Sequence, residues 1–496
     1  MAFPQSRLRA IPTKSRVFIV TDIANEPDDS ESLVRYLLYS NEFDTCGLVA
    51  CTSTHIKRRV CPEEIVNIVN AYGEVVDKLN VHVHPDNPYP TAQSLRDLVR
   101  AGPALYGKEA LKSGVPLSPG AELLVQQLEK STDPLWVCCW GGTNVLAQAL
   151  QHIHQKHMAS EAKEIRSRLR VYTISDQDDT GLWMRVTWPD IFYICSVHGW
   201  SQYHSAAWIG ISGNIDGGSD MSLVAKEWYS KHIQVGPLGK AYPDHKFIVE
   251  GDTPTFLYLI PNGLGSSEHP EWGSWGGRYI PTDRGLAARH YGDATDKAVG
   301  KDGRFYSSNY ATIWRWREAY QHDFAGRIQW TLTDDFTKAN HAPVVSVNGS
   351  TGPEPLTVEV EAGSEVVLDA SETYDPDGDE LTFSWFQYRE VTSALLELHD
   401  QMVATPELTD LDEKIPHRQI KLKVPPADKC AVDFYSGKPV EKGQELHYIL
   451  TVKDNGTPAM LTYKRVIVRI TNPKLLGGSS KSFTTTTDWL EAHGFI

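Results

Sequence analysis

Four acidic residues follow a short apolar run near the start of the chain. The segment VFIVTDIANEPDD begins with four apolar residues and then carries Asp22, Glu26, Asp28 and Asp29. Carboxylates this close together repel one another, and burying them is costly unless a partner compensates their charge. A hard cation such as Ca²⁺ binds six to eight oxygens and prefers carboxylates and carbonyls. The segment therefore predicts a cation site, with capping of the following helix as the alternative for any single aspartate.

A second acidic cluster also follows a predicted strand. The segment LRVYTISDQDD is an apolar run that ends in Asp176, Asp178 and Asp179. One interpretation is a loop of solvated acids. The other is that Asp176 or Asp179 faces a substrate, where it would serve as general acid.

A Gly-rich segment, EHPEWGSWGGRY, combines aromatic and charged side chains. It contains Glu268, Trp272, Trp275 and Arg278. Aromatic faces stack on sugar rings, and Arg and carboxylate groups bind in bidentate fashion, so the segment suits sugar binding. Packing of the Trp side chains against the body of the protein is the equal alternative.

Alternating strand and helix patterns place the two acidic clusters at one edge of a sheet. Strands are predicted at 16–20, 45–53, 80–84, 134–142 and 169–179, and helices at 30–40, 61–79, 120–131 and 143–157. This alternation is typical of a parallel sheet with helices on both faces. Ligands bind such sheets at the carboxyl ends of the strands, where residues 22–29, 141–144 and 175–179 are expected.

The pattern changes after residue 340 to short alternating strands separated by turns, which predicts a β-sandwich. The expected domains are an α/β domain over 15–340, an immunoglobulin-like β-sandwich over 341–473 and a C-terminal arm over 474–496. Within the sandwich, YDPDGDELTFSW is interpreted as a turn between strands, with a weak Ca²⁺ site as the alternative.

Composition restricts the class of partner. The net charge of −15 argues against nucleic acid, and no apolar stretch reaches the length of a membrane span. The first residues lack the apolar segment of a signal peptide, so a cytoplasmic location is predicted, with secretion after removal of a leader as the alternative. A homo-oligomer is compatible with the sequence.

Several segments resemble a known family. VTDIANEPDD is similar to the N-terminal fingerprint of nucleoside hydrolases, and GGTNVLAQAL, with Thr143 and Asn144, is similar to their Gly-x-x-Thr-Asn segment. Together with SDQDDTG, EGDTPTFLYLIPNGL and WGGRY, they make residues 15–472 resemble a family of cellulose-binding proteins. The resemblance implies a nucleoside-hydrolase-like, Rossmann-type parallel sheet with flanking helices, followed by an immunoglobulin-like β-sandwich.

The resemblance also implies roles for single residues. Asp22 and Asp28 are the expected catalytic residues: Asp22 would ligate Ca²⁺ and activate a metal-bound water as general base, and Asp28 would bind a sugar hydroxyl. Asp29, the carbonyl of Thr143 and Asp252 would complete the metal site. A larger set is expected to bind the substrate: Asn25, Glu26, Asn144, Asp176, Asp179, Glu250, Glu268, Trp272, Trp275 and Arg278.

The implied function is Ca²⁺-dependent hydrolysis of a glycosidic or N-glycosidic bond in a carbohydrate, with a plant-wall polysaccharide or oligosaccharide as the expected partner. The alternative is a non-catalytic carbohydrate-binding (cellulose-binding) protein that retains the hydrolase fold. Two departures from the nucleoside-hydrolase pattern favour this alternative or a changed substrate. Val20 replaces the first acid of the fingerprint, and CTSTHIKRR stands where an Asn is usual.

Overall fold

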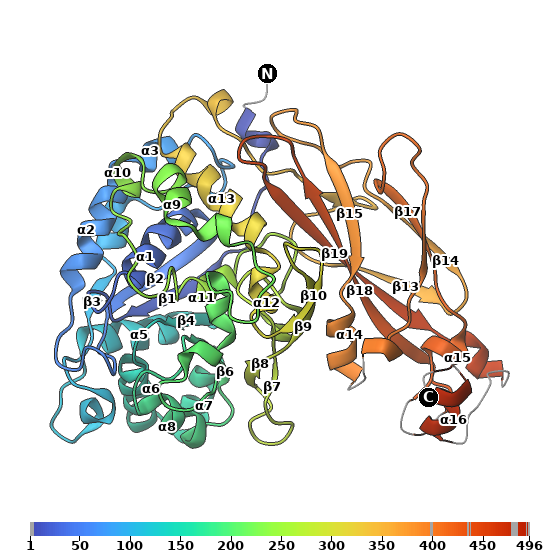
Figure 1. Cartoon of the computed structure of the whole chain (residues 1–496). Coiled ribbons are helices and arrows are strands. Elements are labelled where there is room, and N and C mark those ends of the chain that lie inside the picture. Colours follow the sequence, from blue (N-terminus) through green and yellow to red (C-terminus); the bar gives the residue numbers. More distant parts are fainter. Residues whose placement is uncertain are drawn as a thin grey trace. The chain divides into compact units, whose positions relative to one another are not determined.

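The computed structural model of the chain describes residues 4–396, 400–433, 436, 438–477, 485–492 and 494 (Figure 1). These residues form two compact units. Unit 1 runs to Pro261 and continues over Gly265–Asn340, and unit 2 comprises Asn262–Leu264 and the chain from His341 onward. Among the described residues, no helix is both long and apolar enough to cross a membrane.

Unit 1 is built around an eight-stranded sheet with the order β3-β2-β1-β4-β5-β6-β8-β7. All neighbouring strands are parallel except β7 and β8, which confirms the predicted α/β architecture. The strands are β1 (Ser15–Thr21), β2 (Phe43–Ala50), β3 (Val99–Ala101), β4 (Leu135–Cys139), β5 (Leu169–Thr173), β6 (Phe192–Cys195), β7 (Tyr279–Pro281) and β8 (His290–Asp293). Strand β1 lies between two others and is buried on both faces, which explains the unbroken apolar run in its sequence.

Helices cover the sheet on both faces (Figure 1). On one face, Phe18 and Val20 of β1 join a hydrophobic core with the helices α5 (Pro119–Lys130), α6 (Asn144–Lys156), α7 (Ala159–Ser167) and α8 (Thr180–Thr187). A second group of helices packs together, consisting of α1 (Asp28–Leu38), α2 (Pro62–Gly73), α10 (Gly236–Gly239) and α13 (Arg317–Trp330). The alternation of side chains along β1 thus supplies apolar contacts to both layers.

One predicted strand is wrong. Residues 80–84 alternate apolar and polar side chains, but the structure has turns there, after the short helix α3 (Val76–Leu79). The backbone N–H groups of Val81 and His82 donate to the carbonyls of Lys78 and Leu79, and the Asn80 side chain accepts from the N–H of Tyr89. These local hydrogen bonds replace a sheet ladder, and the third strand forms at β3 instead.

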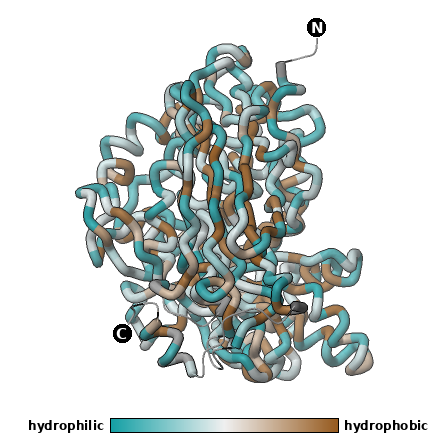
Figure 2. Tube along the Cα trace, turned by 90° about the vertical axis from the view of Figure 1, so that its right-hand side faces the viewer, coloured by the Kyte–Doolittle hydropathy of each residue, from teal (hydrophilic) through white to brown (hydrophobic). Residues whose placement is uncertain are grey.

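Unit 2 contains a four-stranded and a three-stranded sheet of mostly antiparallel strands, as expected for a β-sandwich, and a two-stranded antiparallel sheet of β11 (Ser346–Val347) and β12 (Ser350–Thr351). The first has the order β13-β19-β18-β15, and its β13–β19 pair is parallel. The second has the order β14-β17-β16. The strands are β13 (Leu356–Glu361), β14 (Glu365–Asp369), β15 (Thr382–Gln387), β16 (Glu407–Asp410), β17 (Gln419–Lys423), β18 (Lys442–Lys453) and β19 (Leu461–Thr471). The long strands that cross Figure 2 carry both hydrophobic and hydrophilic segments, as strands with two different faces do.

The acidic segment of unit 2 forms the expected turn. The Oδ1 atom of Asp375 accepts hydrogen bonds from the backbone N–H groups of Asp377, Gly378 and Asp379 at 2.8–3.1 Å. Asp377 is in turn bound by the His341 side chain. Carboxylate oxygens of the three aspartates lie within 4.8 Å of one another. The backbone hydrogen bonds account for this closeness as an Asx turn, so the acids alone do not establish a cation site.

Candidate functional site

Three loops meet at the carboxyl edge of the sheet in unit 1. The N–H of Trp140, after β4, donates to the Val20 carbonyl at 2.8 Å. The N–H of Thr54, after β2, donates to the Gln177 carbonyl beyond β5 at 2.7 Å. These hydrogen bonds continue the sheet into its loops, so side chains from different strands are held in one place.

The first loop turns sharply between β1 and α1. The Asn25 N–H donates to the Asp22 carbonyl at 3.1 Å, and Ala24 has a φ of 77°, which is uncommon for a residue with a Cβ atom. Helix α1 then begins at Asp28, so Asp28 and Asp29 lie in its first turn, where the helix dipole favours negative charge. The Thr21 hydroxyl donates to the Asp29 carboxylate and fixes its orientation.

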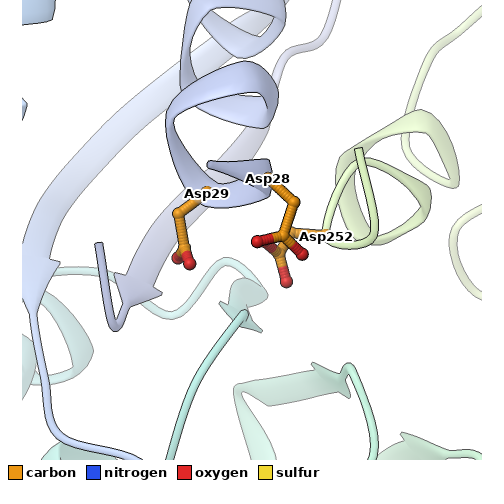
Figure 3. Close-up of side chains that lie close together, drawn as sticks. All are labelled: Asp28, Asp29 and Asp252. Atoms are coloured by element: carbon orange, nitrogen blue, oxygen red, sulfur yellow. The ribbon is translucent and has the colours of Figure 1, made fainter. Parts of the chain in front are cut away.

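Three carboxylates from two distant segments converge beside this helix. Oxygens of Asp28, Asp29 and Asp252 lie within 4.8 Å of one another, and all three residues are buried. Figure 3 shows Asp28 and Asp29 on the first turn of α1 and Asp252 reaching the same space from the neighbouring segment. Asp252 lies two residues before the short helix α11 (Pro254–Leu257). Asp22 lies outside this group of three but lines the same pocket.

Several of these carboxylate oxygens have no hydrogen-bond partner among the described residues. They are Asp22 Oδ2, Asp28 Oδ1 and Asp252 Oδ2, each buried from solvent. A buried anionic oxygen without a partner costs free energy, so this arrangement needs protons or a cation.

The electrostatics of the group lead to the same requirement. Burial raises the pKa of Asp22 to about 6. Burial and the neighbouring carboxylates also hold the pKa values of Asp28, Asp29 and Asp252 well above their usual range. Buried carboxylates, unpartnered oxygens and an all-oxygen donor set fit a hard divalent cation such as Ca²⁺.

Thr143 is the residue before α6, in the loop that follows β4, and β4 pairs with β1. Its carbonyl accepts the first helical hydrogen bond, from the Ala147 N–H at 2.9 Å, and its hydroxyl is bound to Asp178 and Thr180. A carbonyl oxygen has a second lone pair, so this hydrogen bond leaves it able to ligate a cation. Its role as a metal ligand stays a prediction.

The four acids open into a pocket of about 430 Å³, which we call the acidic pocket. Asn25 and Glu26, two of the residues expected to bind substrate, line it. Its other walls are largely aromatic, amide or aliphatic: His55, Trp140, Ile174, Gln177, Tyr203, Trp208, Ile209, Phe247 and Ile248. Aromatic faces beside hydrogen-bonding groups are the surface that a sugar ring requires.

Two predicted substrate-binding residues lie beside the acidic pocket and do not line it. The Asn144 amide donates to the Thr52 hydroxyl at 2.9 Å and to the Leu105 carbonyl at 2.8 Å. Glu250 is paired with the buried Arg35 at 2.7 Å and has a φ of 55°. These contacts position the loops around the acids, and direct binding of substrate by either residue stays a prediction.

The Gly-rich segment does not reach the acidic pocket. Glu268 pairs with Arg170 at 2.8 Å, and Arg278 pairs with Asp296 at 2.7 Å. Trp275 is fully buried, and Trp272 stacks on His269. These side chains therefore make packing and ion-pair contacts in the structure. Sugar binding by them stays a prediction.

The second acidic cluster lies at a different pocket from the one that Asp22, Asp28, Asp29 and Asp252 line. Asp176 accepts two hydrogen bonds from Arg185, and Asp179 accepts the Lys108 N–H at 2.8 Å. Both line a second pocket next to the acidic one, whereas Gln177, between them, lines the acidic pocket. Their proximity to a pocket agrees with the expectation that they face a substrate, which stays a prediction.

The aromatic wall of the acidic pocket was not predicted from the sequence. Tyr203, Trp208 and Phe247 come from the long segment between β6 and β7, which has no regular periodicity. The only available signal was its high content of aromatic residues, which does not distinguish pocket walls from packed side chains.

Comparison with known families identifies the group to which the chain belongs. The family model described as "Cellulose-binding Sde182, nucleoside hydrolase-like domain" matches residues 16–279, more than half of the chain. The chain belongs to this cellulose-binding family. A second model, "Cellulose-binding protein Sde0182, C-terminal domain", matches residues 365–470. The family resemblance predicted from the sequence segments is thereby confirmed.

A solved structure agrees with the Sde182 family assignment. A nucleoside hydrolase-related hypothetical protein from Saccharophagus degradans, described as associated with carbohydrate metabolism, is 28% identical with a TM-score of 0.73. The similarity covers 92% of this chain and 100% of that one, so the nucleoside-hydrolase-like fold is shown. An inosine-uridine preferring nucleoside hydrolase from Bacillus anthracis is 15% identical over 64% of this chain and 100% of its own, with a TM-score of 0.31. No curated protein matches this Sde182 family member.

Proposed function

We propose that this chain is a Ca²⁺-dependent hydrolase of a glycosidic or N-glycosidic bond and that it acts on a carbohydrate. The observation that carries the proposal is the convergence of Asp28, Asp29 and Asp252 within 4.8 Å, at a pocket that Asp22 also lines. A purely structural cluster would pair its buried carboxylates with Arg or Lys, as Glu250 is paired with Arg35. Here the carboxylates face one another and a pocket with aromatic walls.

The cation would be held by Asp22, Asp29, Asp252 and the Thr143 carbonyl, with Asp28 beside them. When bound, such a cation neutralises clustered carboxylates and lowers the pKa of water at the site. The buried, unpartnered oxygens of Asp22 and Asp252 supply donors for it.

The chain's own residues would then perform two tasks. Asp22 takes the proton of the attacking water as general base. Asp28, which lines the acidic pocket, accepts a hydrogen bond from a sugar hydroxyl and so orients the ring. The clustered carboxylates beside the sugar also stabilise the positive charge that develops on the sugar carbon as the bond to the leaving group breaks.

A second candidate is a carbohydrate-binding protein without catalysis. It is favoured by the family description, which is cellulose-binding, and by the aromatic wall of Tyr203, Trp208 and Phe247. In that case the acids would only hold a cation and a sugar, with no proton transfer.

A substrate screen distinguishes the two. The full chain is incubated with cello-oligosaccharides, aryl glycosides and nucleosides, with added Ca²⁺ and after treatment with EDTA, and products are separated by anion-exchange chromatography. We expect cleavage of a carbohydrate that EDTA abolishes and Ca²⁺ restores. Binding of the sugars without cleavage supports the second candidate. Cleavage of nucleosides alone contradicts a carbohydrate substrate, and cleavage that EDTA leaves unchanged contradicts the role of the cation.

A further inference from the structure

A second pocket of about 500 Å³ lies beside the acidic pocket in unit 1. We call it the tryptophan pocket, because Trp183 and Trp200 line it together with Tyr203, His198, Lys108 and Asp178. Its residues come from the start of η3 (Gly107–Leu111), from the loop after β5, from α8 and from the segment after β6. None of the roles argued above for the acidic pocket uses Trp183 or Trp200.

Exposed apolar side chains gather at this pocket. Trp200 is 72% exposed, Val186 on α8 is 73% exposed and Val197 is 71% exposed. Large apolar groups that stay exposed together cost solvation free energy, and such patches commonly mark binding surfaces. An exposed indole beside polar groups offers a flat face to a ring that is apolar on its faces and polar at its edge.

Polar groups stand at the same pocket. Asp178 is 6% exposed, and its Oδ1 accepts hydrogen bonds from the N–H and hydroxyl of Thr180 at 2.8 and 2.5 Å. Its Oδ2 has no hydrogen-bond partner among the described residues. Asp176 and Asp179 in the same lining disfavour anions, and because both are paired with cations (Arg185 and Lys108), the pocket needs no cationic ligand to balance their charge.

The two pockets share a wall. Tyr203 lines both, and its ring lies 6.0 Å from that of His55 in the acidic pocket and 5.1 Å from that of His198 in the tryptophan pocket. Behind it, the Ser175 hydroxyl is bound to His198 at 2.7 Å and to Trp208 of the acidic pocket at 3.0 Å. The two pockets therefore adjoin at Tyr203.

The loop after β5 is built to serve both pockets. Ile174 and Gln177 line the acidic pocket, whereas Asp176, Asp178 and Asp179 line the tryptophan pocket. One short loop thus contributes side chains to both pockets. The spacing of the two pockets therefore depends on this loop.

We propose that the tryptophan pocket is a subsite for the neighbouring sugar unit of a linked, uncharged saccharide, and that the ligand of this chain is an oligosaccharide that spans both pockets. This inference rests on the proposed function only in placing one sugar unit in the acidic pocket. It names the substrate class: an oligosaccharide of two or more neutral units, in preference to a nucleoside or a monosaccharide. Given the family description, β-linked glucose oligomers are the class to test.

The test measures binding and does not require turnover. Affinities of the full chain for glucose, cellobiose, cellotriose and cellotetraose are determined by isothermal titration calorimetry in the presence of Ca²⁺, at a temperature and time where cleavage is negligible. Four proteins are compared: the wild type, Trp200→Ala, Val186→Ser, and Phe305→Ala as a matched control. Phe305 is an aromatic residue with 68% exposure outside both pockets.

We expect the wild type to bind cellobiose and longer oligomers more tightly than glucose. In Trp200→Ala the affinity for the longer oligomers should fall on the order of 10-fold, toward that for glucose, because a stacking face is removed. Its affinity for glucose should be unchanged, and Phe305→Ala should match the wild type throughout. A second variant, Val186→Ser on α8, should likewise lower the affinity for the longer oligomers and leave the affinity for glucose unchanged.

Three results would overturn the subsite: equal affinity of the wild type for glucose and its oligomers, equal effects of Trp200→Ala and Phe305→Ala, or no binding of any cello-oligosaccharide. The proposed hydrolase activity is tested separately, by cleavage of the sugars. If length-dependent binding is lost in Trp200→Ala while no sugar is ever cleaved, the subsite stands and the hydrolase proposal fails. If sugars are cleaved while binding does not depend on length, the hydrolase stands and the subsite fails.

Discussion

Oxygens of Asp29, in the first turn of α1, and Asp252, before α11, lie within 4.8 Å of one another in the interior of unit 1. Two buried carboxylates in this position repel each other, so the contact destabilises the fold unless a cation or protons occupy it. A ligand that binds only the folded state stabilises it by mass action.

Calcium is therefore expected to stabilise the wild type against thermal unfolding, by about 2.7 kcal/mol when its concentration is 100 times the Kd. Asp252→Asn should lose most of this Ca²⁺-dependent gain, because an amide binds the cation more weakly than a carboxylate. Differential scanning calorimetry with Ca²⁺ and with EDTA measures the effect. Asp302→Asn, at an exposed site outside the pocket, is the matched control and should respond to Ca²⁺ like the wild type. An unchanged melting temperature in wild type would contradict the cation site.

Gly141, between β4 and α6, leaves room for Asp22. A Cβ atom on Gly141 would lie 2.5 Å from Asp22 Oδ1 and 2.7 Å from its Cβ and Cγ, so Gly141→Ala must displace the carboxylate. Turnover should fall on the order of 10²-fold, as for other displacements of about 1 Å in an active site, with the fold retained. In Gly285→Ala the nearest atoms lie at 3.4 Å, so activity should persist. Steady-state kinetics and circular dichroism check both variants; full activity of Gly141→Ala would show that the position of Asp22 is unimportant.

Arg35 and Glu250 form a fully buried ion pair at 2.7 Å under the acidic loop. Arg35→Met keeps an apolar side chain of similar length but leaves the Glu250 charge buried without its cation, which should cost about 3–5 kcal/mol of unfolding free energy. Adding Glu250→Gln removes that charge and should recover part of the loss. Lys226→Met breaks the exposed pair with Asp244 and should change stability little. Urea denaturation provides the comparison, and a double variant no more stable than Arg35→Met would refute the explanation by an uncompensated charge.

Glu445, on β18 of unit 2, gives a pH-dependent contribution to stability. Its hydrogen bonds with His447 and Arg469 lower the pKa of Glu445 from 4.5 to about 2, against the effect of burial. Because the native pKa is the lower one, the contribution is present above about pH 4.5 and is lost as the pH falls toward about 2. In Glu445→Gln this contribution is absent, so its melting temperature should lie below that of the wild type at pH 6 and approach it at pH 3. Glu407→Gln, on β16, is the control, and a difference between Glu445→Gln and wild type that is constant with pH would contradict the assignment.

The positions of Asp22, Asp28 and Asp29 were predictable because a buried parallel strand has to end at the sheet edge where ligands bind. Asp252 was expected from the family resemblance alone, since its approach to α1 depends on a long segment without periodicity. The strand predicted at 80–84 does not form, although apolar and polar side chains alternate there. Hydrogen bonds between near neighbours, such as that from the Tyr89 N–H to the Asn80 side chain, hold these residues in turns.

Aromatic residues were the least predictable part of the site. Trp272 and Trp275 have the composition of a sugar-binding segment, and both pack in the interior. Tyr203 and Trp208 carry no motif, and both line the acidic pocket. Whether an aromatic side chain packs or lines a pocket depends on which surfaces the folded chain leaves open, and this is not encoded in local sequence patterns.

The most direct test of the account compares the rate of glycosyl-bond cleavage by wild type, Asp22→Asn and Asp28→Asn on one carbohydrate that the wild type cleaves in the presence of Ca²⁺. An amide at position 22 retains an oxygen for the cation but cannot accept a proton at neutral pH. We predict that kcat of Asp22→Asn falls on the order of 10²–10⁴-fold, with KM little changed, whereas Asp28→Asn mainly raises KM. Equal turnover of wild type and Asp22→Asn would contradict Asp22 as the general base and with it the proposed mechanism.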